Sequence, residues 1–188
     1  LQPYGCGCVL FKDPTVARFY GHDSPYTYFT TGGGHLGEIA LECSRPGAAA
    51  AALWATLRAV PLEPDKGLGD ILAAGRRAAI AMADAIAAHD RLRLVLDPET
   101  DIVLFAPGGD RATAVTAATE KLFDAASANP GDPVYLAKMR VSSTWLAGHW
   151  KGLVCDADET VVARSVLMKP EHEREWPAIV RRLSELLD

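Results

Sequence analysis

The order of hydrophobic and polar residues divides this chain into segments with the spacing of strands and helices. Residues 6–11 form a continuous apolar run that ends at a Lys-Asp-Pro turn, which is typical of a strand buried on both faces of an α/β sheet. Residues 15–20 predict a short helix. A longer helix is predicted over 48–60, because Ser44 can cap its start and Pro46 suits a first helical turn.

Beyond residue 60 the pattern changes to helices that alternate with short strands. Apolar residues recur at helical spacing over 68–89, and LRLVLD and IVLFAP then read as a hairpin. The other elements expected are a helix over 111–128, strand-like runs in VYLAKMRVSST, GLVCD and VVARSVLM, and an amphipathic helix over 173–187. We therefore expect helices packed on a small antiparallel sheet, an α+β unit with its own core over 61–188.

A long polar and aromatic loop, residues 21–34, separates the first elements. Loops of this length are functional or disordered, and its aromatic residues favour an ordered, functional loop. The three glycines that follow Thr31 can cradle a phosphate through backbone N–H groups, although mobile loops also use such runs. His22 and His35 are either surface residues or groups that stack or transfer protons when the loop closes over a ligand.

Composition and charge indicate an ordinary soluble globular protein. Of the 188 residues, 49% are hydrophobic and 23% charged, and the net charge of −5 offers no basic field for nucleic acid or anionic lipid. The longest apolar run, AAAAALWA, is too short to cross a bilayer, and the first eight residues lack the features of a signal peptide. Four cysteines in apolar settings suit a reducing cytoplasm, so we expect a cytoplasmic protein with no membrane or nucleic-acid partner.

The cysteines do not have the spacing of a metal site. Cys6 and Cys8 share one face of the expected strand, whereas a structural zinc site needs two such pairs and Cys43 and Cys155 are single. We expect Cys6 and Cys8 to pack as small hydrophobic residues and no metal to be bound.

Two arginines stand in positions that call for an anionic partner. Arg45 lies near the start of a helix, where a cation opposes the helix dipole, so it has either a structural salt bridge or a ligand. Arg164 lies within the otherwise apolar or small run VVARSVLM. A half-buried arginine must be paired, either with an internal Asp or Glu or with a substrate carboxylate.

Three segments carry a resemblance to a known family: LECSRPGAAAAALWATLRAVPL, PYGCGCVLFKD and VVARSVLMKPE. Together they resemble the C-terminal part of the pyridoxal-phosphate-dependent group II decarboxylases, which include the glutamate, aromatic amino acid and tyrosine decarboxylases. The resemblance implies an α/β fold of fold-type I. Residues 1–60 would hold the last strand of the large-domain sheet, an active-site loop and a linking helix, and 61–188 an α+β C-terminal small domain.

The resemblance also implies roles for individual residues. The Schiff-base lysine of the family would lie just upstream of residue 1, and no lysine of this chain stands in that context. Arg164 matches the arginine that binds the substrate α-carboxylate. The loop would contribute Tyr28 and His35 to catalysis, and the residues expected near pyridoxal 5'-phosphate are Thr31, Gly32, Gly33 and Arg45.

The function implied is decarboxylation of an amino acid by the full-length enzyme, acting with its N-terminal portion and as a homodimer. The chain by itself is expected to be inactive. Two alternatives stay open: a fold-related carbon–carbon lyase similar to sphingosine-phosphate lyase, and, for the isolated chain, a non-catalytic dimerisation module.

Overall fold

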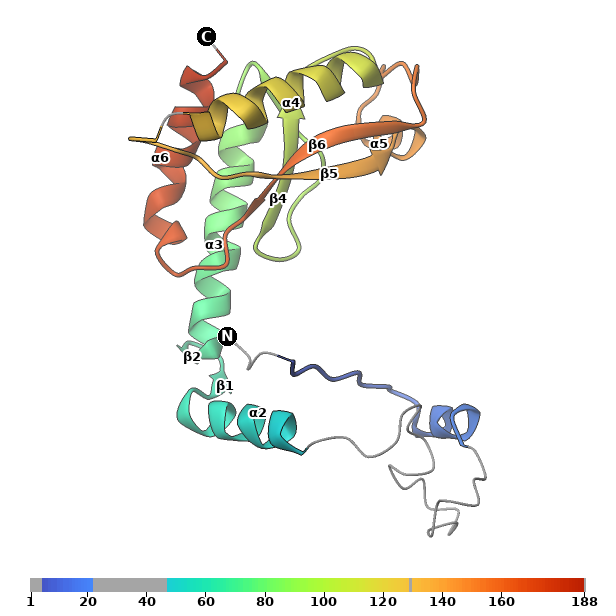
Figure 1. Ribbon diagram of the computed structural model, residues 1–188, viewed down its shortest axis with the longest axis vertical. Helices are drawn as coiled ribbons and strands as arrows, with labels where there is room; N and C mark the ends of the chain where they lie inside the picture. Colours follow the sequence, from blue (N-terminus) through green and yellow to red (C-terminus); the bar gives the residue numbers. More distant parts are fainter. Residues whose placement is uncertain (1–4, 22–46, 129, 188) are drawn as a thin grey trace. The chain divides into compact units, whose positions relative to one another are not determined.

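A computed structural model describes residues 5–21, 47–128 and 130–187 of the chain (Figure 1). The chain divides into two compact units, Leu1–Leu62 and Glu63–Asp188. Among the described residues no helix is both long and apolar enough to cross a membrane.

The first unit contains the 3-10 helix η1 (Pro14–Phe19), which confirms the short helix expected in this region. It begins at Asp13, whose carboxylate accepts hydrogen bonds from the backbone N–H and the hydroxyl of Thr15 at 2.9 and 2.7 Å. These bonds satisfy a backbone donor that the first helical turn leaves free, which is why the helix begins there.

The strand predicted over residues 6–11, the last strand of a large-domain sheet, is not formed, and this prediction is wrong for the structure. Val9 and Leu10 are 77% and 89% exposed, and Cys8 is exposed as well. A buried strand is stable only when neighbouring strands take its backbone hydrogen bonds, and the described residues of this unit provide none. Cys6 and Cys8 therefore do not pack in a strand core here.

The alanine-rich helix is confirmed as α2 (Ala48–Ala59), with Gly47 at its N-cap. None of its residues is buried within the unit. Trp54 is 65% exposed and lies beside the guanidinium of Arg58, 5.3 Å from the ring centroid. The predicted capping residues Ser44 and Pro46 lie outside the described residues.

The second unit is built on a four-stranded antiparallel sheet. Its order is β3-β4-β6-β5, so the strand that is last along the chain lies between β4 and β5 (Figure 1). The strands are β3 (Leu92–Leu94), β4 (Ile102–Pro107), β5 (Ala137–Ser142) and β6 (Glu159–Val166). This confirms the mixed α/β prediction, the hairpin and the strand in VVARSVLM, whereas GLVCD contributes only an isolated bridge between Val154 and Arg111.

Four helices accompany the sheet: α3 (Leu68–Ala87), α4 (Ala112–Ala128), α5 (Ser143–His149) and α6 (His172–Glu185). All but α5 were expected from the sequence. A small hairpin, β1 (Leu62–Glu63) and β2 (Lys66–Gly67), precedes α3 along the chain.

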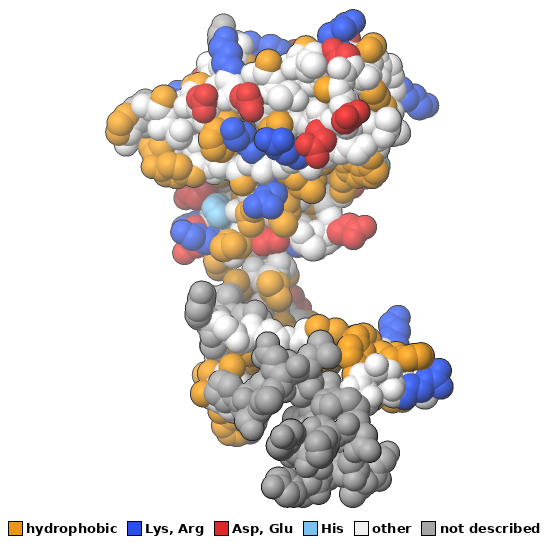
Figure 2. Space-filling model, turned by 45° about the vertical axis from the view of Figure 1, so that its right-hand side comes forward, with side chains coloured by type: hydrophobic (Ala, Val, Ile, Leu, Met, Phe, Trp, Pro, Cys, Tyr) orange, Lys and Arg blue, Asp and Glu red, His pale blue; other side chains and the backbone are white. Residues whose placement is uncertain are grey.

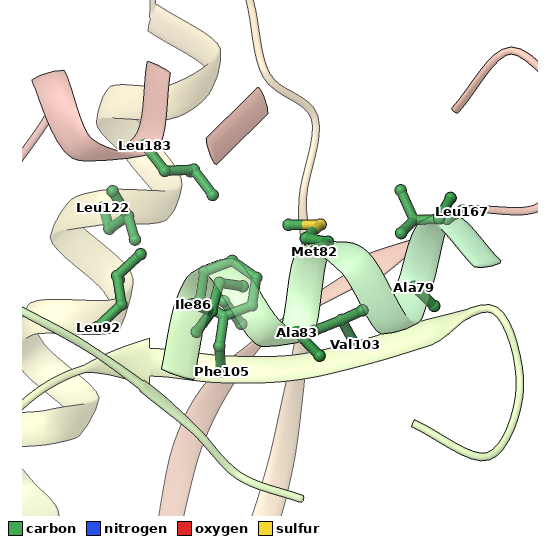
Figure 3. Packing of buried hydrophobic residues seen from close by; sticks show 12 residues of the cluster. Ala79, Met82, Ala83, Ile86, Leu92, Val103, Phe105, Leu122, Leu167 and Leu183 are labelled. Carbon is green, nitrogen blue, oxygen red and sulfur yellow. The ribbon is translucent and has the colours of Figure 1, made fainter. Parts of the chain in front are cut away.

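One face of the sheet is covered by α3, α4 and α6. Val103 and Phe105 of β4 are fully buried there and point towards Ile86 and Ala83 of α3 (Figure 3). Leu183 of α6 joins the same cluster (Figure 3). Burial of such side chains contributes roughly 1.5–3 kcal/mol each, so this cluster holds the three helices on the sheet.

A second cluster centres on Trp150, which follows α5 and is 2% exposed. Its indole N–H donates to the carbonyl oxygen of Leu94 at 2.7 Å, and the guanidinium of Arg93 lies 4.3 Å from the indole ring centroid. Ala106 of β4 and Val162 of β6 belong to this cluster. It therefore covers part of the sheet face opposite α3.

Candidate functional site

The candidate site is built on Arg164, which the middle of β6 places on the sheet. Valine-rich sequence around it favours an extended, half-buried strand. In the antiparallel register Arg164 lies opposite Leu104 of β4 on one side and opposite Ala137 of β5 on the other. Directly paired residues project from the same face, so all three side chains leave the sheet on one side.

This surface is termed the Arg164 face, and it is the face opposite the cluster of Val103, Phe105 and Ala163. Paired residues and every second residue along a strand share a face. Around Arg164, the residues of the Arg164 face are Ile102, Leu104, Ala137, Met139, Val162 and Val166.

Only one end of the Arg164 face is covered within the second unit. Val162 packs in the Trp150 cluster and is fully buried. Towards the other end Ile102 and Val166 are only partly buried. On the edge strand β5, Met139 lies beside Val162 and is 39% exposed. Arg164 thus lies where the covered part of the face meets the open part.

Arg164 is half-buried, and one atom of its guanidinium, Nε, is buried without a hydrogen-bond partner. The described residues provide no carboxylate within ion-pair distance. Arg182, whose Nε is also buried without a hydrogen bond, has the Asp132 carboxylate at 3.5 Å. Arg164 therefore differs from Arg182 in having no carboxylate beside its guanidinium among the described residues.

The remaining predicted site residues cannot be compared with this arrangement, because they lie outside the described residues. They are the loop residues Tyr28 and His35, expected in catalysis, and Thr31, Gly32, Gly33 and Arg45, expected near the cofactor.

Lysines and potential metal ligands do not form a second site in the described part of the chain. Every lysine side chain is exposed: Lys12, Lys66, Lys121, Lys138, Lys151 and Lys169. No group of three or more His, Cys, Asp or Glu residues among the described residues could hold a metal ion.

The apolar residues around Arg164 were not recognised as part of the site from the sequence. Leu104 and Ala137 are distant from Arg164 along the chain and become its neighbours only through strand register. The signal available was the alternation of Val162, Arg164 and Val166 along one strand, which places them on one face.

The sequence matches no family model and no curated protein. Solved structures do match the fold. Mouse CSAD in its apo form aligns over 91% of this chain with a TM-score of 0.56 and 13% sequence identity. The glutamate decarboxylase domain of a diaminobutyrate-pyruvate transaminase and L-2,4-diaminobutyrate decarboxylase from Vibrio parahaemolyticus covers 73% at a TM-score of 0.49 and 17% identity. Oryza sativa TDC with PLP and tryptamine aligns over 74% of this chain with a TM-score of 0.49 and 18% sequence identity.

These structural neighbours are group II pyridoxal-phosphate decarboxylases, and the chain covers only a fragment of each. It spans 25%, 27% and 33% of the lengths of the Vibrio, Oryza and mouse chains. The match to mouse CSAD confirms the expected resemblance at the level of the fold.

Proposed function

We propose that this chain is the C-terminal part of a pyridoxal-phosphate-dependent amino acid decarboxylase, in which Arg164 binds the α-carboxylate of the substrate. In this proposal residues 1–60 are the end of the cofactor-binding large domain and 61–188 are the small domain. The enzyme acts with its N-terminal portion, as a homodimer in the cytoplasm.

The observation that carries the proposal is the environment of Arg164. Arg164 is half-buried on an apolar face with no carboxylate beside it among the described residues. Its outer nitrogens are not among the buried unpaired atoms, so they can receive an anion from outside. The planar fork of arginine suits a carboxylate, which it can bind through two parallel hydrogen bonds. The fold shared with mouse CSAD supports the family side of the proposal.

The described residues fit the substrate's carboxylate, but they do not include a lysine suited to hold the cofactor. A lysine that carries this cofactor covalently works in an enclosed site, whereas every lysine of this chain is exposed. On the resemblance to the group II decarboxylases, we propose that the cofactor-bearing lysine lies just upstream of residue 1. When bound, pyridoxal phosphate supplies an electron sink for the pair released as the carboxylate leaves.

Arg164 would contribute by orientation and by the loss of an ion pair. Its two outer nitrogens fix the direction of the carbon–carboxylate bond, and the apolar neighbours Leu104 and Val162 reduce the water around that ion pair. The carboxylate loses its charge as it leaves as carbon dioxide, so the arrangement favours departure of that group.

The test is Arg164→Met in the full-length enzyme, with Arg140→Met as the matched control. Arg140 is an exposed residue of β5 that pairs with Glu159. We expect Arg164→Met to raise KM or lower kcat/KM by about 100-fold or more while absorbance shows an unchanged cofactor content. Unchanged kinetics in Arg164→Met, or an equal loss in Arg140→Met, would remove the proposed role.

A further inference from the structure

The side chains next to Arg164 on its face are all apolar. Leu104 and Ala137 lie directly opposite it on the two neighbouring strands, and Val162 and Val166 are two residues away along β6. A ligand whose carboxylate reaches Arg164 therefore meets only hydrocarbon side chains beside it among the described residues of this face.

The next positions extend the same apolar surface. Ile102 is paired with Val166 and is partly buried, and Met139 is paired with Val162 and is 39% exposed. These side chains keep accessible apolar area, so a ligand that covers them gains hydrophobic stabilisation.

The same face has no second cation beside Arg164 in the described residues. Arg93 of β3 projects from this face opposite Ala106, but its guanidinium lies 4.3 Å from the ring centroid of Trp150. It belongs to the covered end of the face, and the whole of β4 separates it from β6. A second anionic group on a ligand would thus be desolvated against apolar side chains without a partner.

We infer that the Arg164 face selects a carboxylate attached to an apolar or aromatic body and disfavours a dicarboxylate. This inference rests on the proposed function and narrows its substrate class to apolar or aromatic amino acids. The selectivity comes from Leu104, Val166 and Met139, and the affinity for the carboxylate itself comes from Arg164.

The inference can be tested on the chain of 188 residues by following the side-chain Nε–H signals of arginine by NMR. The Arg164 signal is identified by its loss in Arg164→Lys, and backbone amide signals report whether each variant is folded. The probes are acetate, phenylacetate and succinate at matched ionic strength. We expect all three to move the Arg164 signal, with a half-saturating concentration of phenylacetate about tenfold lower than that of acetate. Succinate should bind no more tightly than acetate.

Two further variants separate the apolar contribution from the charge. Val166→Thr keeps the shape of a partly buried side chain and should reduce the preference for phenylacetate while leaving acetate unchanged. Arg140→Gln, on the opposite face of β5, should change neither response.

The outcomes distinguish this inference from the proposed function. Equal binding of acetate and phenylacetate, or tighter binding of succinate, would overturn the apolar selectivity and leave Arg164 as a carboxylate site. A folded chain whose Arg164 signal responds to none of the probes would contradict carboxylate binding by Arg164, and with it the proposed function.

Discussion

Arg164 of β6 lies directly opposite Leu104 of β4, so a cation and an aliphatic side chain share one face of an antiparallel pair. The Nε of this arginine is buried and has no hydrogen-bond partner. Burial of this Nε is unfavourable for folding, because no described residue offsets the loss of its hydrogen bond to water. This arrangement is the basis of the proposal that Arg164 binds a carboxylate.

The first prediction concerns stability at this position. Arg164→Met in the isolated chain should leave the free energy of unfolding unchanged or raise it by up to about 1 kcal/mol, because it removes an unpaired buried donor. Arg77→Met is the comparison: Arg77 of α3 pairs through two nitrogens with Glu173 of α6, and its loss should be destabilising. Urea unfolding measures the free energy of unfolding of both variants. A marked decrease in Arg164→Met would indicate a structural role for Arg164.

Gly75 of α3 permits a close approach of the chain after β6. A Cβ at this position would lie 2.8 Å from the carbonyl oxygen of Leu167, and Cβ of Asp101 would be 3.3 Å away. Although alanine is the better helix former, Gly75→Ala should destabilise the unit by about 1–3 kcal/mol. Gly148→Ala in α5 is the control, since nothing lies within 4 Å of its added Cβ and stability should hold or rise. Equal gains in both variants would contradict the close packing.

Two buried threonines should respond oppositely to the same substitution. Thr119 of α4 has a buried hydroxyl with no partner, so Thr119→Val should raise the free energy of unfolding by about 1 kcal/mol. The hydroxyl of Thr160 is 2.8 Å from that of Ser143, and both residues are fully buried. Thr160→Val leaves the Ser143 hydroxyl without a hydrogen-bond partner and should lower the free energy of unfolding by about 1–3 kcal/mol. A double-mutant cycle with Ser143→Ala should recover part of that loss.

The start of α4 predicts a dependence on pH. The Asp156 carboxylate accepts hydrogen bonds from the hydroxyl and backbone N–H of Thr113, and these, with the nearby Arg111, hold the pKa of Asp156 below its usual value. A lowered pKa in the folded state adds stability above the unfolded value, about 3.9, and that stability is lost as pH falls through the folded value. Asp156→Asn should therefore be destabilising at pH 7.

The difference in stability between the wild type and Asp156→Asn should narrow as pH falls below about 4. Thermal unfolding at a series of pH values measures it. The wild type, measured at the same pH values, is the reference. A difference for Asp156→Asn that stays constant down to pH 2 would mean that the carboxylate charge is not involved.

The spacing of hydrophobic residues was sufficient to predict the long or strongly patterned helices and strands of the second unit. Helix α3 repeats its apolar residues at helical spacing, and β6 is a valine-rich run bounded by turns. The short helix α5 was missed because its seven residues include Ser, Thr and Gly and hold little periodic signal. The strand expected at residues 6–11 fails for another reason, since strand formation depends on partners that local sequence does not specify.

The candidate site, too, could be predicted only in part from the sequence. Arg164 stood out because one cation interrupts an apolar strand. Its neighbours Leu104 and Ala137 could not be assigned to it, because register between distant strands is a property of the folded sheet. The match to mouse CSAD supports the fold, and the binding role of Arg164 rests on its unpaired Nε.

The central claim, that this chain belongs to an enzyme whose cofactor is held by a lysine just upstream of residue 1, has a direct test. The protein expressed from its full gene is reduced with borohydride, digested, and mapped by mass spectrometry. We expect one phosphopyridoxyl-lysine in the peptide immediately before Leu1. A protein with no modified lysine, or with the modification on a lysine within residues 1–188, would contradict it.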